Sequence, residues 1–400
     1  MTNLNHLKDK PIAILGGGTT GRCQAADCAL ANREVRLYEL PEFAKDLGKI
    51  IESRELRLSG PQVNLYGFKR DGLAKINIIT TDMKEAVDGA GIISVSIPAI
   101  GFQAFFEQLI PHLEDGMVIH FCTGNFGSLL LRKMMRQARC DKKVIIGEWS
   151  SQPYGVRIRT EGGVKLPELN LLYRAITLRG AALPSADQSV FLESAKYFPP
   201  LDSVVDPVEG DTVIDIGLSN VNPMLHVPGT ILGVGVMENW GVVFGHDKYE
   251  FSIYSHAYCP SISEIQYAFY QEERRIAEAI GVGIQPFDKQ DFFSRTNILG
   301  AEFMGPDVVV PFTEQFHLLK ATGPYNIHNR YITEDVPVGC HIFYELGKKF
   351  GVQTPIIKSF ITLASVMTKI DIFQTGVTLK DLGIANMNKT QLLKYLHEGL

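Results

Sequence analysis

The sequence predicts a doubly wound α/β domain at the N-terminus, followed by a mostly α-helical domain. The first half of the chain alternates short apolar runs with helical patterns, which is typical of parallel strands joined by crossover helices. Strand signals become scarce after residue 245. At roughly 100–200 residues per domain, the 400 residues suit two domains. The stiff Pro-Pro pair at residues 199–200 separates the two patterns, so we expect domains at residues 1–198 and 199–400.

The elements of the first half can be placed by run length and periodicity. Apolar runs of strand length occur at residues 11–15, 34–40, 76–80, 91–97, 117–122 and 143–148. Helical patterns lie between them at residues 21–32, 83–88, 102–113 and 128–139. Two later stretches, residues 155–166 and 173–183, predict additional strands that run antiparallel to the others.

The second half carries three helical signals. Ser261 and Glu264 have the spacing of a capping box, which predicts a helix beginning there. Gly281 follows the last apolar residue of that pattern and is expected to end the helix. Residues 339–350 and 354–369 predict two more helices, the second with Pro355 near its start.

Charge and composition exclude several classes of protein. The formal net charge is −5 and no Lys/Arg-rich block is present, so we expect no nucleic-acid partner. No run of about 18 uncharged apolar residues occurs, and we expect no membrane-spanning helix. The six cysteines form no CxxC pair, which predicts neither a metal site nor a disulfide framework. The N-terminus lacks the apolar stretch of a signal peptide, so a cytoplasmic protein is expected.

The first motif is a glycine loop between the first predicted strand and the first predicted helix. Gly16, Gly18 and Gly21 form G-x-G-x-x-G, with Thr19 and Thr20 between the last two glycines. In this context the first glycine permits a tight turn, the second lets a pyrophosphate approach the backbone, and the third lets helix and strand pack closely. The free N–H groups of the helix N-terminus attract the anion. The motif predicts a Rossmann-type dinucleotide site, with an empty glycine turn as the alternative.

Glu39 closes the second predicted strand, 18 residues after Gly21. That offset is close to the one expected of the acid that hydrogen-bonds the adenosine ribose. A carboxylate repels a 2′-phosphate, so NAD is favoured over NADP. Arg33 and Arg36 are the two cations that could reverse this preference by turning toward the same pocket.

Two more turns follow strands of the same sheet. Residues 97–101 contain Pro98, and residues 122–127 contain Asn125. Both turns are expected at the carboxyl edge of the sheet, where a nicotinamide must lie. Plain glycine turns are the alternative at both places.

His226 is distinguished from the other nine histidines by its surroundings. Asn220 and Asn222 precede it in an otherwise apolar stretch, just before Pro223. Buried polar groups are normally hydrogen-bonded or functional. A histidine in a general acid/base role is one interpretation, and a structural histidine is the other.

A second polar cluster spans residues 328–335. Arg330 has the fork-shaped guanidinium that binds a carboxylate bidentately. Asp335 could orient a histidine and favour its imidazolium form. His328 is a rival general base, and a solvated charged loop is the structural alternative.

Together these motifs resemble the opine dehydrogenases, the octopine/nopaline dehydrogenase group. The matching residues extend over nearly the whole chain and are Gly16, Gly18, Gly21, Glu148, Pro153, Tyr154, Arg157, Asn220, Asn222, Pro223, His226, Arg330, Tyr331, Thr333, Glu334, Asp335, Val336 and Pro337. The resemblance implies a nucleotide-binding domain joined to a helical substrate domain. It also implies reductive condensation of an amino acid with a 2-oxo acid such as pyruvate, using NADH or NADPH.

By this resemblance His226 is the acid/base, Asp335 is its partner, and Arg330 binds a substrate carboxylate. Glu148, Asn125 and Asn222 are expected at the substrate site, with Glu148 contacting the amine. The pair Asn125-Phe126 departs from many relatives, which leaves the identity of the amine open. The expected partners are small-molecule substrates, with no nucleic acid and no membrane; a homodimer is compatible with the sequence, which sets no oligomeric state.

Two other functions remain open. One is a two-domain reductase of ketones or 2-oxo acids, similar to glycerol-3-phosphate or ketopantoate reductases. Those enzymes commonly depend on a lysine in the helical domain, whereas the clusters here contain His, Arg and Asp. The other is a non-enzymatic dinucleotide sensor, which would not need His226, Arg330 and Asp335 together.

Overall fold

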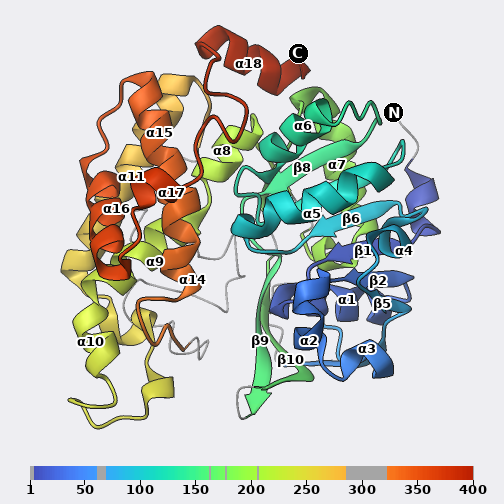
Figure 1. Cartoon of the computed structure of the whole chain (residues 1–400), viewed down its shortest axis with the longest axis horizontal. Coiled ribbons are helices and arrows are strands. Elements are labelled where there is room, and N and C mark those ends of the chain that lie inside the picture. The colour runs from blue at the N-terminus through green and yellow to red at the C-terminus, as the bar shows by residue number, and fades with distance from the viewer. Residues whose placement is uncertain are drawn as a thin grey trace. The chain divides into compact units, whose positions relative to one another are not determined.

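The computed structural model describes residues 4–60, 69–161, 164–175, 178–204, 207–284 and 322–399 (Figure 1). These residues form two compact units. The first contains the described residues up to Ile216 together with residues 391–399, and the second contains those from Gly217 to Thr390. Within these ranges no helix has the length and apolarity that a membrane span requires, and no cluster of His, Cys, Asp or Glu is suited to a metal.

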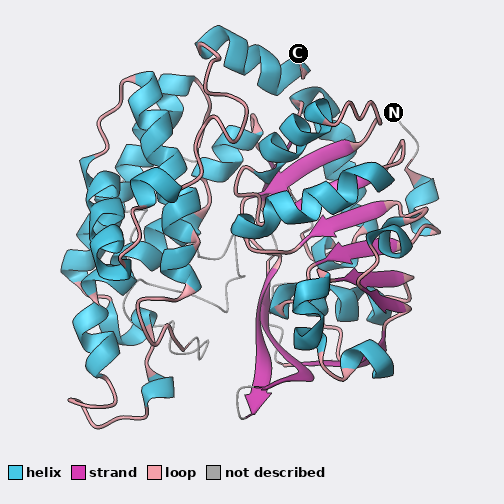
Figure 2. Cartoon of the chain, viewed as in Figure 1, coloured by secondary structure: helices cyan, strands magenta, loops and turns pink. Residues whose placement is uncertain are grey.

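The first unit is built on an eight-stranded sheet with the order β12-β11-β8-β7-β6-β1-β2-β5 (Figure 2). Its strands are β1 (Ile12–Leu15), β2 (Val35–Tyr38), β5 (Ile78–Thr80), β6 (Ile92–Val95), β7 (Val118–Cys122), β8 (Ile145–Trp149), β11 (Arg179–Ala182) and β12 (Val208–Glu209). In this sheet order, every neighbouring pair from β8 to β5 is parallel, and β11 runs antiparallel to β8. The parallel core confirms the predicted doubly wound domain, because each of its strands is a short apolar run buried on both faces.

Helices cover both faces of this sheet. On one face α4 (Met83–Val87), α5 (Phe102–Leu109) and α6 (Gly127–Gln137) pack in succession. On the other face α1 (Thr19–Leu30) and α7 (Gln188–Ser194) share one buried apolar cluster with β1 and with the second, smaller sheet. Two short helices, α2 (Ala44–Leu47) and α3 (Ile50–Ser53), follow β2.

The second sheet has the order β4-β3-β10-β9. Its strands are β3 (Glu55–Ser59), β4 (Gly72–Lys75), β9 (Tyr154–Glu161) and β10 (Val164–Arg174). The single strand predicted at residues 155–166 is wrong, because β9 ends at Glu161 and β10 begins at Val164. The strand predicted at 173–183 is wrong for the same reason, since β10 ends at Arg174 and β11 begins at Arg179. In β3 only Leu56 and Leu58 are buried, which leaves too short an alternation to predict a strand.

A buried ion pair joins α1 to β10. Both oxygens of the Asp27 carboxylate accept hydrogen bonds from the Arg174 guanidinium, at 2.7 and 2.8 Å, and neither side chain is exposed. Arg70 also donates to Asp27, at 3.0 Å, and to the carbonyl of Pro199, at 3.3 Å. The Pro199–Leu201 turn is therefore buried inside the first unit and packs on α1. The sequence predicts a domain boundary at residue 198, whereas the compact units divide at Ile216, within α8 (Val213–Leu218).

The second unit is helical in its described residues, which confirms the predicted class. Its α-helices are α9 (Val221–Leu232), α10 (Val234–Asn239), α11 (Pro260–Ile280), α14 (Arg330–Thr333), α15 (His341–Phe350), α16 (Pro355–Thr368) and α17 (Ile372–Thr375). The capping box predicted at Ser261 is wrong: α11 begins one residue earlier, at Pro260, whose fixed φ angle suits the first helical position. The last helix, α18 (Lys389–Glu398), belongs mainly to the first unit.

Candidate active site

The glycine loop connects β1 to α1, as the motif predicts. Gly16 has φ +107°, and a Cβ atom there would lie 2.7 Å from the carbonyl oxygen of Ser96. A Cβ atom on Gly21 would lie 1.8 Å from the carbonyl oxygen of Gly16. Both positions therefore require glycine for packing alone, whether or not a ligand binds.

Gly18 differs from the other two glycines because a Cβ atom there would face open space. It would meet no atom of the described residues within 4 Å beyond its chain neighbours, and the Gly18 backbone is extended (φ −71°, ψ −175°). Helix α1 begins at the next residue without a capping side chain, and Thr19 and Thr20 in its first turn are half-buried. Open space in front of uncapped N–H groups is suited to an anion, so these residues fit the pyrophosphate of a dinucleotide.

Glu39 lies beside the loop and is held by backbone donors. Its Oε2 accepts a hydrogen bond from the Gly17 N–H at 2.8 Å, and its Oε1 accepts one from the Leu40 N–H at 2.9 Å. The side chain remains half-exposed. Arg22, which is fully buried, donates from Nε to the Gly17 carbonyl at 2.7 Å and so fixes the loop from within. Sequence reasoning missed Arg22, because an arginine in a helix is usually solvated.

The two arginines that could serve a 2′-phosphate are engaged elsewhere. Arg36 pairs with Glu34 at 2.9 Å and donates to the Asp88 carbonyl at 2.8 Å. Arg33 donates to the backbone carbonyls of residues 7 and 10, at 2.5 and 3.2 Å, and to that of Tyr197. Neither arginine contacts Glu39 through these bonds. A ligand at the end of β2 would therefore meet the negative charge of the Glu39 carboxylate.

The turns after β6 and β7 lie at the carboxyl edge of the sheet, as expected. Pro98 is exposed there, and the neighbouring Ile97 packs against Gly16. Asn125 and Phe126 both adopt left-handed backbone angles, with φ +49° and +62°. Because residues other than glycine rarely adopt this conformation, the turn needs support from its surroundings.

Glu148 supplies that support from the neighbouring strand β8. Its carboxylate accepts hydrogen bonds from the N–H groups of Ser128 (2.8 Å) and Phe126 (3.1 Å) and from the Ser128 hydroxyl. Burial raises the pKa of the Glu148 carboxyl to about 7, against the opposing effect of these bonds. The side chain is 0% exposed, so the structure places it behind the Asn125 turn as a cap for α6. The predicted contact with an amine stays a prediction.

In the second unit, Asn220 and His226 belong to the same helix. Asn220 is the N-cap of α9, and its side-chain oxygen accepts the Asn222 N–H at 3.1 Å. The polarity of Asn220 therefore has a structural reason. Asn222 and His226 are four residues apart in α9, which puts them on the same helix face, and both are partly exposed.

His226 is held on three sides. Its Nδ1 lies 2.8 Å from Asp335 Oδ2, and its Nε2 lies 3.0 Å from the Tyr254 hydroxyl. The Tyr331 ring stacks on the imidazole, with ring centroids 3.7 Å apart and planes 10° from parallel. The His226 and Asp335 side chains are 12% and 11% exposed. The structure therefore brings the two predicted partners together in a largely water-excluded pair.

Arg330 stands at the surface near this pair. Its side chain is 68% exposed, and its Nη2 lies 2.9 Å from Glu334 Oε2. Glu334 is itself almost fully buried, and the pair is four residues apart on one helical turn. Most of the Arg330 side chain is therefore accessible from outside. His328, the rival base, is exposed in the segment before α14.

Sequence reasoning missed Tyr254 and the role of Tyr331. Tyr254 lies in a π-helical turn, Ile253–Ala257, 28 residues after His226. No motif marks it, and an aromatic residue in an apolar stretch predicts only a core position. Tyr331 follows Arg330 directly, but stacking on an imidazole leaves no signature in sequence spacing.

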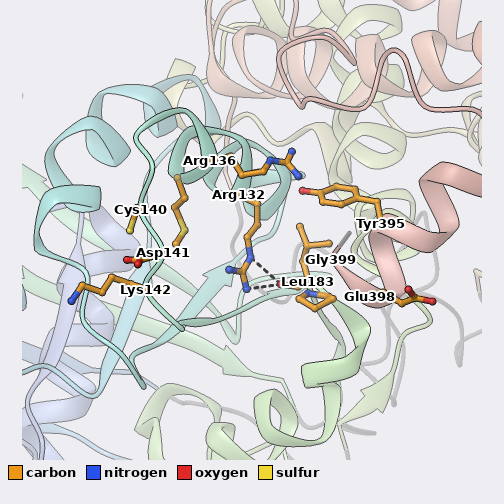
Figure 3. Close-up of a pocket in the computed structure, with 11 residues that line it drawn as sticks. Arg132, Arg136, Cys140, Asp141, Lys142, Leu183, Tyr395, Glu398 and Gly399 are labelled. Carbon is orange, nitrogen blue, oxygen red and sulfur yellow. Dashed lines mark hydrogen bonds between the residues drawn. The ribbon is translucent and has the colours of Figure 1, made fainter.

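The first unit also has a pocket of about 310 Å³ at the C-terminal end of α6 (Figure 3). Arg132 donates to the Leu183 carbonyl at 3.0 Å, and Arg136 lies over the Tyr395 ring of α18. Lys142, another lining residue, precedes β8. The pocket therefore lies at the amino edge of the parallel strands, opposite the glycine loop, and is separate from the dinucleotide-binding residues.

Comparison with known proteins identifies relatives along the whole chain. Residues 209–368 match the family model of the NAD/NADP octopine/nopaline dehydrogenase α-helical domain. An opine dehydrogenase from Arthrobacter sp. (strain 1C) is 25% identical over 397 residues, which cover 95% of this chain and 97% of the relative. A vitopine synthase from Allorhizobium ampelinum is 22% identical and covers 96% of this chain and 99% of its own length.

Solved structures share the fold. Octopine dehydrogenase in complex with NADH and agmatine has a TM-score of 0.69 at 17% identity, over 98% of each chain. NADP⁺-bound yersinopine dehydrogenase has a TM-score of 0.65 at 13% identity, over 98% of this chain and 99% of the other.

A ketopantoate reductase from Ralstonia eutropha JMP134 also shares the fold. Its TM-score is 0.55 at 17% identity, over 90% of this chain and 98% of the reductase. The similarity in fold alone therefore extends to the alternative reductases. The family model and the full-length relatives, by contrast, are opine dehydrogenases and not ketone reductases. They support the opine dehydrogenase family for this chain and indicate a nicotinamide-dependent oxidoreductase acting on CH–NH groups.

Proposed function

We propose that this enzyme condenses an amino acid, or another amine, with a 2-oxo acid such as pyruvate and reduces the product to a secondary-amine dicarboxylate, an opine. The same site would carry out the reverse oxidation. The observation that supports this most strongly is the His226–Asp335 pair, 2.8 Å apart, with the exposed side chain of Arg330 five residues before Asp335. An acid/base pair and a carboxylate-binding arginine are the two groups that this reaction needs from the protein.

The cofactor is held by the first unit. The backbone at Gly18 and the first turn of α1 at Thr19 and Thr20 bind the pyrophosphate, and Glu39 accepts hydrogen bonds from the adenosine ribose. Pro98 borders the nicotinamide at the carboxyl edge. When bound, the reduced nicotinamide supplies the hydride. All six cysteines are free, which supports a reducing compartment such as the cytoplasm.

His226 moves the proton. Asp335 accepts the Nδ1–H bond, which fixes the imidazole tautomer and orientation. The Nε2 atom is then the one that gives up a proton during reduction and takes one back during oxidation. Asn222 lies on the same helix face and is proposed to contact the substrate. Asn125 is proposed to contact the amine, with Glu148 acting through the turn that it supports.

The 2-oxo acid depends on Arg330 in this proposal. A bidentate charge-assisted contact contributes on the order of 2–4 kcal/mol. Arg330→Lys keeps the charge but loses the fork, so we expect the KM for the 2-oxo acid to rise more than about tenfold. Steady-state kinetics at saturating amine and NADH measure this.

Arg274→Lys is the matched control, because Arg274 forms the same kind of i,i+4 pair, with Glu278 at 2.9 Å, in the same unit. An unchanged KM in Arg330→Lys, or an equal rise in both variants, would remove Arg330 from this role.

Cofactor preference should depend on Glu39. We expect the enzyme to use NADH in preference to NADPH, because a 2′-phosphate would meet the Glu39 carboxylate while Arg33 and Arg36 are engaged elsewhere. Glu39→Ala should narrow the preference, measured as the ratio of kcat/KM for the two cofactors. Glu193→Ala, which removes an exposed carboxylate that pairs with Lys196 in the same unit, should leave the ratio unchanged. A wild-type enzyme that prefers NADPH would contradict this interpretation.

Requirement for two substrates tests the function itself. We expect NADH oxidation to need both a 2-oxo acid and an amine in a screen of amino acids against several 2-oxo acids. A ketone reductase would oxidise NADH with the 2-oxo acid alone. The reductase remains the second candidate because a ketopantoate reductase shares the fold. A dinucleotide sensor would not oxidise NADH, whether a 2-oxo acid, an amine or both are added.

A further inference from the structure

Tyr254 occupies the position next to the nitrogen that exchanges the proton. Asp335 engages Nδ1 of His226, which leaves Nε2 as the reactive atom, and the Tyr254 hydroxyl lies 3.0 Å from it. With the proton on Nδ1, Nε2 is an acceptor, so the Tyr254 hydroxyl donates to it. The Tyr254 side chain is only 7% exposed, which excludes most water from this bond.

A second hydroxyl continues the line of polar groups. The Tyr331 hydroxyl lies 3.4 Å from that of Tyr254, while the Tyr331 ring stacks on His226. Asp335, His226, Tyr254 and Tyr331 thus form one connected series in the second unit. Among the described residues, the titratable groups that contact Tyr254 include His226, Tyr331 and Tyr258, whose ring meets the Tyr254 ring edge-on at 5.7 Å.

We propose that Tyr254 is a catalytic residue that relays the proton between His226 Nε2 and the substrate; this rests on the proposed function. During reduction the Nε2–H bond breaks as the proton passes to the Tyr254 oxygen. The original Tyr254 O–H bond breaks at the same time, and its proton forms the new N–H bond of the substrate. The net change moves one proton from the imidazolium to the substrate, and Tyr254 ends neutral.

The relay accounts for both states of the histidine. When His226 is protonated, Nε2–H donates to the Tyr254 oxygen, and the phenol hydrogen turns away from Nε2 toward the substrate. When His226 is neutral, the phenol hydrogen points to Nε2. The same two heavy atoms remain hydrogen-bonded throughout, so neither state leaves a buried polar group without a partner.

Tyr254→Phe tests the relay, and Tyr258→Phe is its matched control. Tyr258 belongs to the same aromatic cluster, but its hydroxyl donates to the Leu225 carbonyl at 2.6 Å and so has a structural role. We expect Tyr254→Phe to lower kcat at least about tenfold with the Kd for NADH unchanged. Tyr258→Phe should lower the melting temperature, while kcat should change little. A kcat within twofold of wild type in Tyr254→Phe would overturn the proposal.

The number of protons that move in the rate-limiting step distinguishes a relay from a structural role of Tyr254. In mixtures of H₂O and D₂O, we expect kcat of the wild-type enzyme to depend on the deuterium fraction quadratically, because two protons move together. The dependence should become linear in Tyr254→Phe and stay quadratic in Tyr258→Phe. A linear dependence in the wild type would overturn the relay even if Tyr254→Phe is slow.

A measurement without substrate keeps this proposal separate from the proposed function. The ¹⁵N chemical shift of His226 Nε2 should report an accepted hydrogen bond at high pH, which Tyr254→Phe removes and Tyr258→Phe retains. If no amine and 2-oxo acid pair supports NADH oxidation, the proposed function fails. If that reaction occurs but the Nε2 shift is the same in Tyr254→Phe, the relay fails alone.

Discussion

Replacing His226 by alanine should lower turnover by about 10²–10⁴, which is the usual contribution of a positioned general acid/base. The variant loses the imidazole that lies 2.8 Å from Asp335 and so has no group to exchange the proton. The Kd for NADH should stay nearly unchanged, because the glycine loop belongs to the first unit and His226 to the second. Steady-state kinetics and fluorescence titration with NADH measure the two quantities.

His328→Ala is the control for this prediction, since His328 is an exposed histidine in the same unit. It should change turnover by no more than a few-fold. Asp335→Asn should lower turnover, because the carboxylate that holds Nδ1 of His226 at 2.8 Å and fixes its tautomer is lost. If His328→Ala abolishes turnover while His226→Ala stays within a few-fold of wild type, the acid/base role belongs to His328.

Gly18→Val should abolish tight dinucleotide binding without harming the fold. A Cβ atom at Gly18 meets nothing within 4 Å, and the extended backbone suits any residue, so the melting temperature should hardly change. The new side chain would fill the space in front of the uncapped N-terminus of α1. Losing two charge-assisted hydrogen bonds to phosphate, each contributing about 1.5–3 kcal/mol, predicts a Kd for NADH at least about a hundredfold higher.

Gly21→Ala is the matched comparison, because a Cβ atom there lies 1.8 Å from the Gly16 carbonyl oxygen. That variant should lower the melting temperature before any ligand is added. Calorimetry and NADH titration of both variants separate the two roles. Unchanged NADH affinity in a folded Gly18→Val enzyme would show that the dinucleotide does not approach this part of the loop.

The fold could be predicted where each element has its own local signal. The strand Ile12–Leu15 is a short apolar run, and the glycines after it admit only a tight turn, so strand, loop and helix follow from composition. The second sheet could not be predicted in this way. Its strand Glu55–Ser59 pairs with Val164–Arg174, more than a hundred residues away, and depends on that partner for its stability.

The candidate site likewise contains residues that have a local sequence signal and residues that have none. His226, Asp335 and Arg330 stand in polar clusters that are visible in the sequence. Tyr254 and Arg22 act through hydrogen bonds to His226 Nε2 and to the Gly17 carbonyl, which no sequence pattern reveals. For Glu148 the resemblance implies a contact with the amine, which stays a prediction. The structure adds a role that the sequence did not indicate, because its carboxylate accepts hydrogen bonds from Phe126 and Ser128.

The fate of the hydride tests the central claim most directly. The enzyme would be incubated with NADH deuterated at the transferred position, a 2-oxo acid and an amino acid, and the products analysed by mass spectrometry and NMR. We expect one deuterium on the carbon that joins the former 2-oxo acid to the nitrogen of a secondary amine. Deuterium found only in a 2-hydroxy acid, with the amino acid unchanged, would contradict the account and identify a ketone reductase.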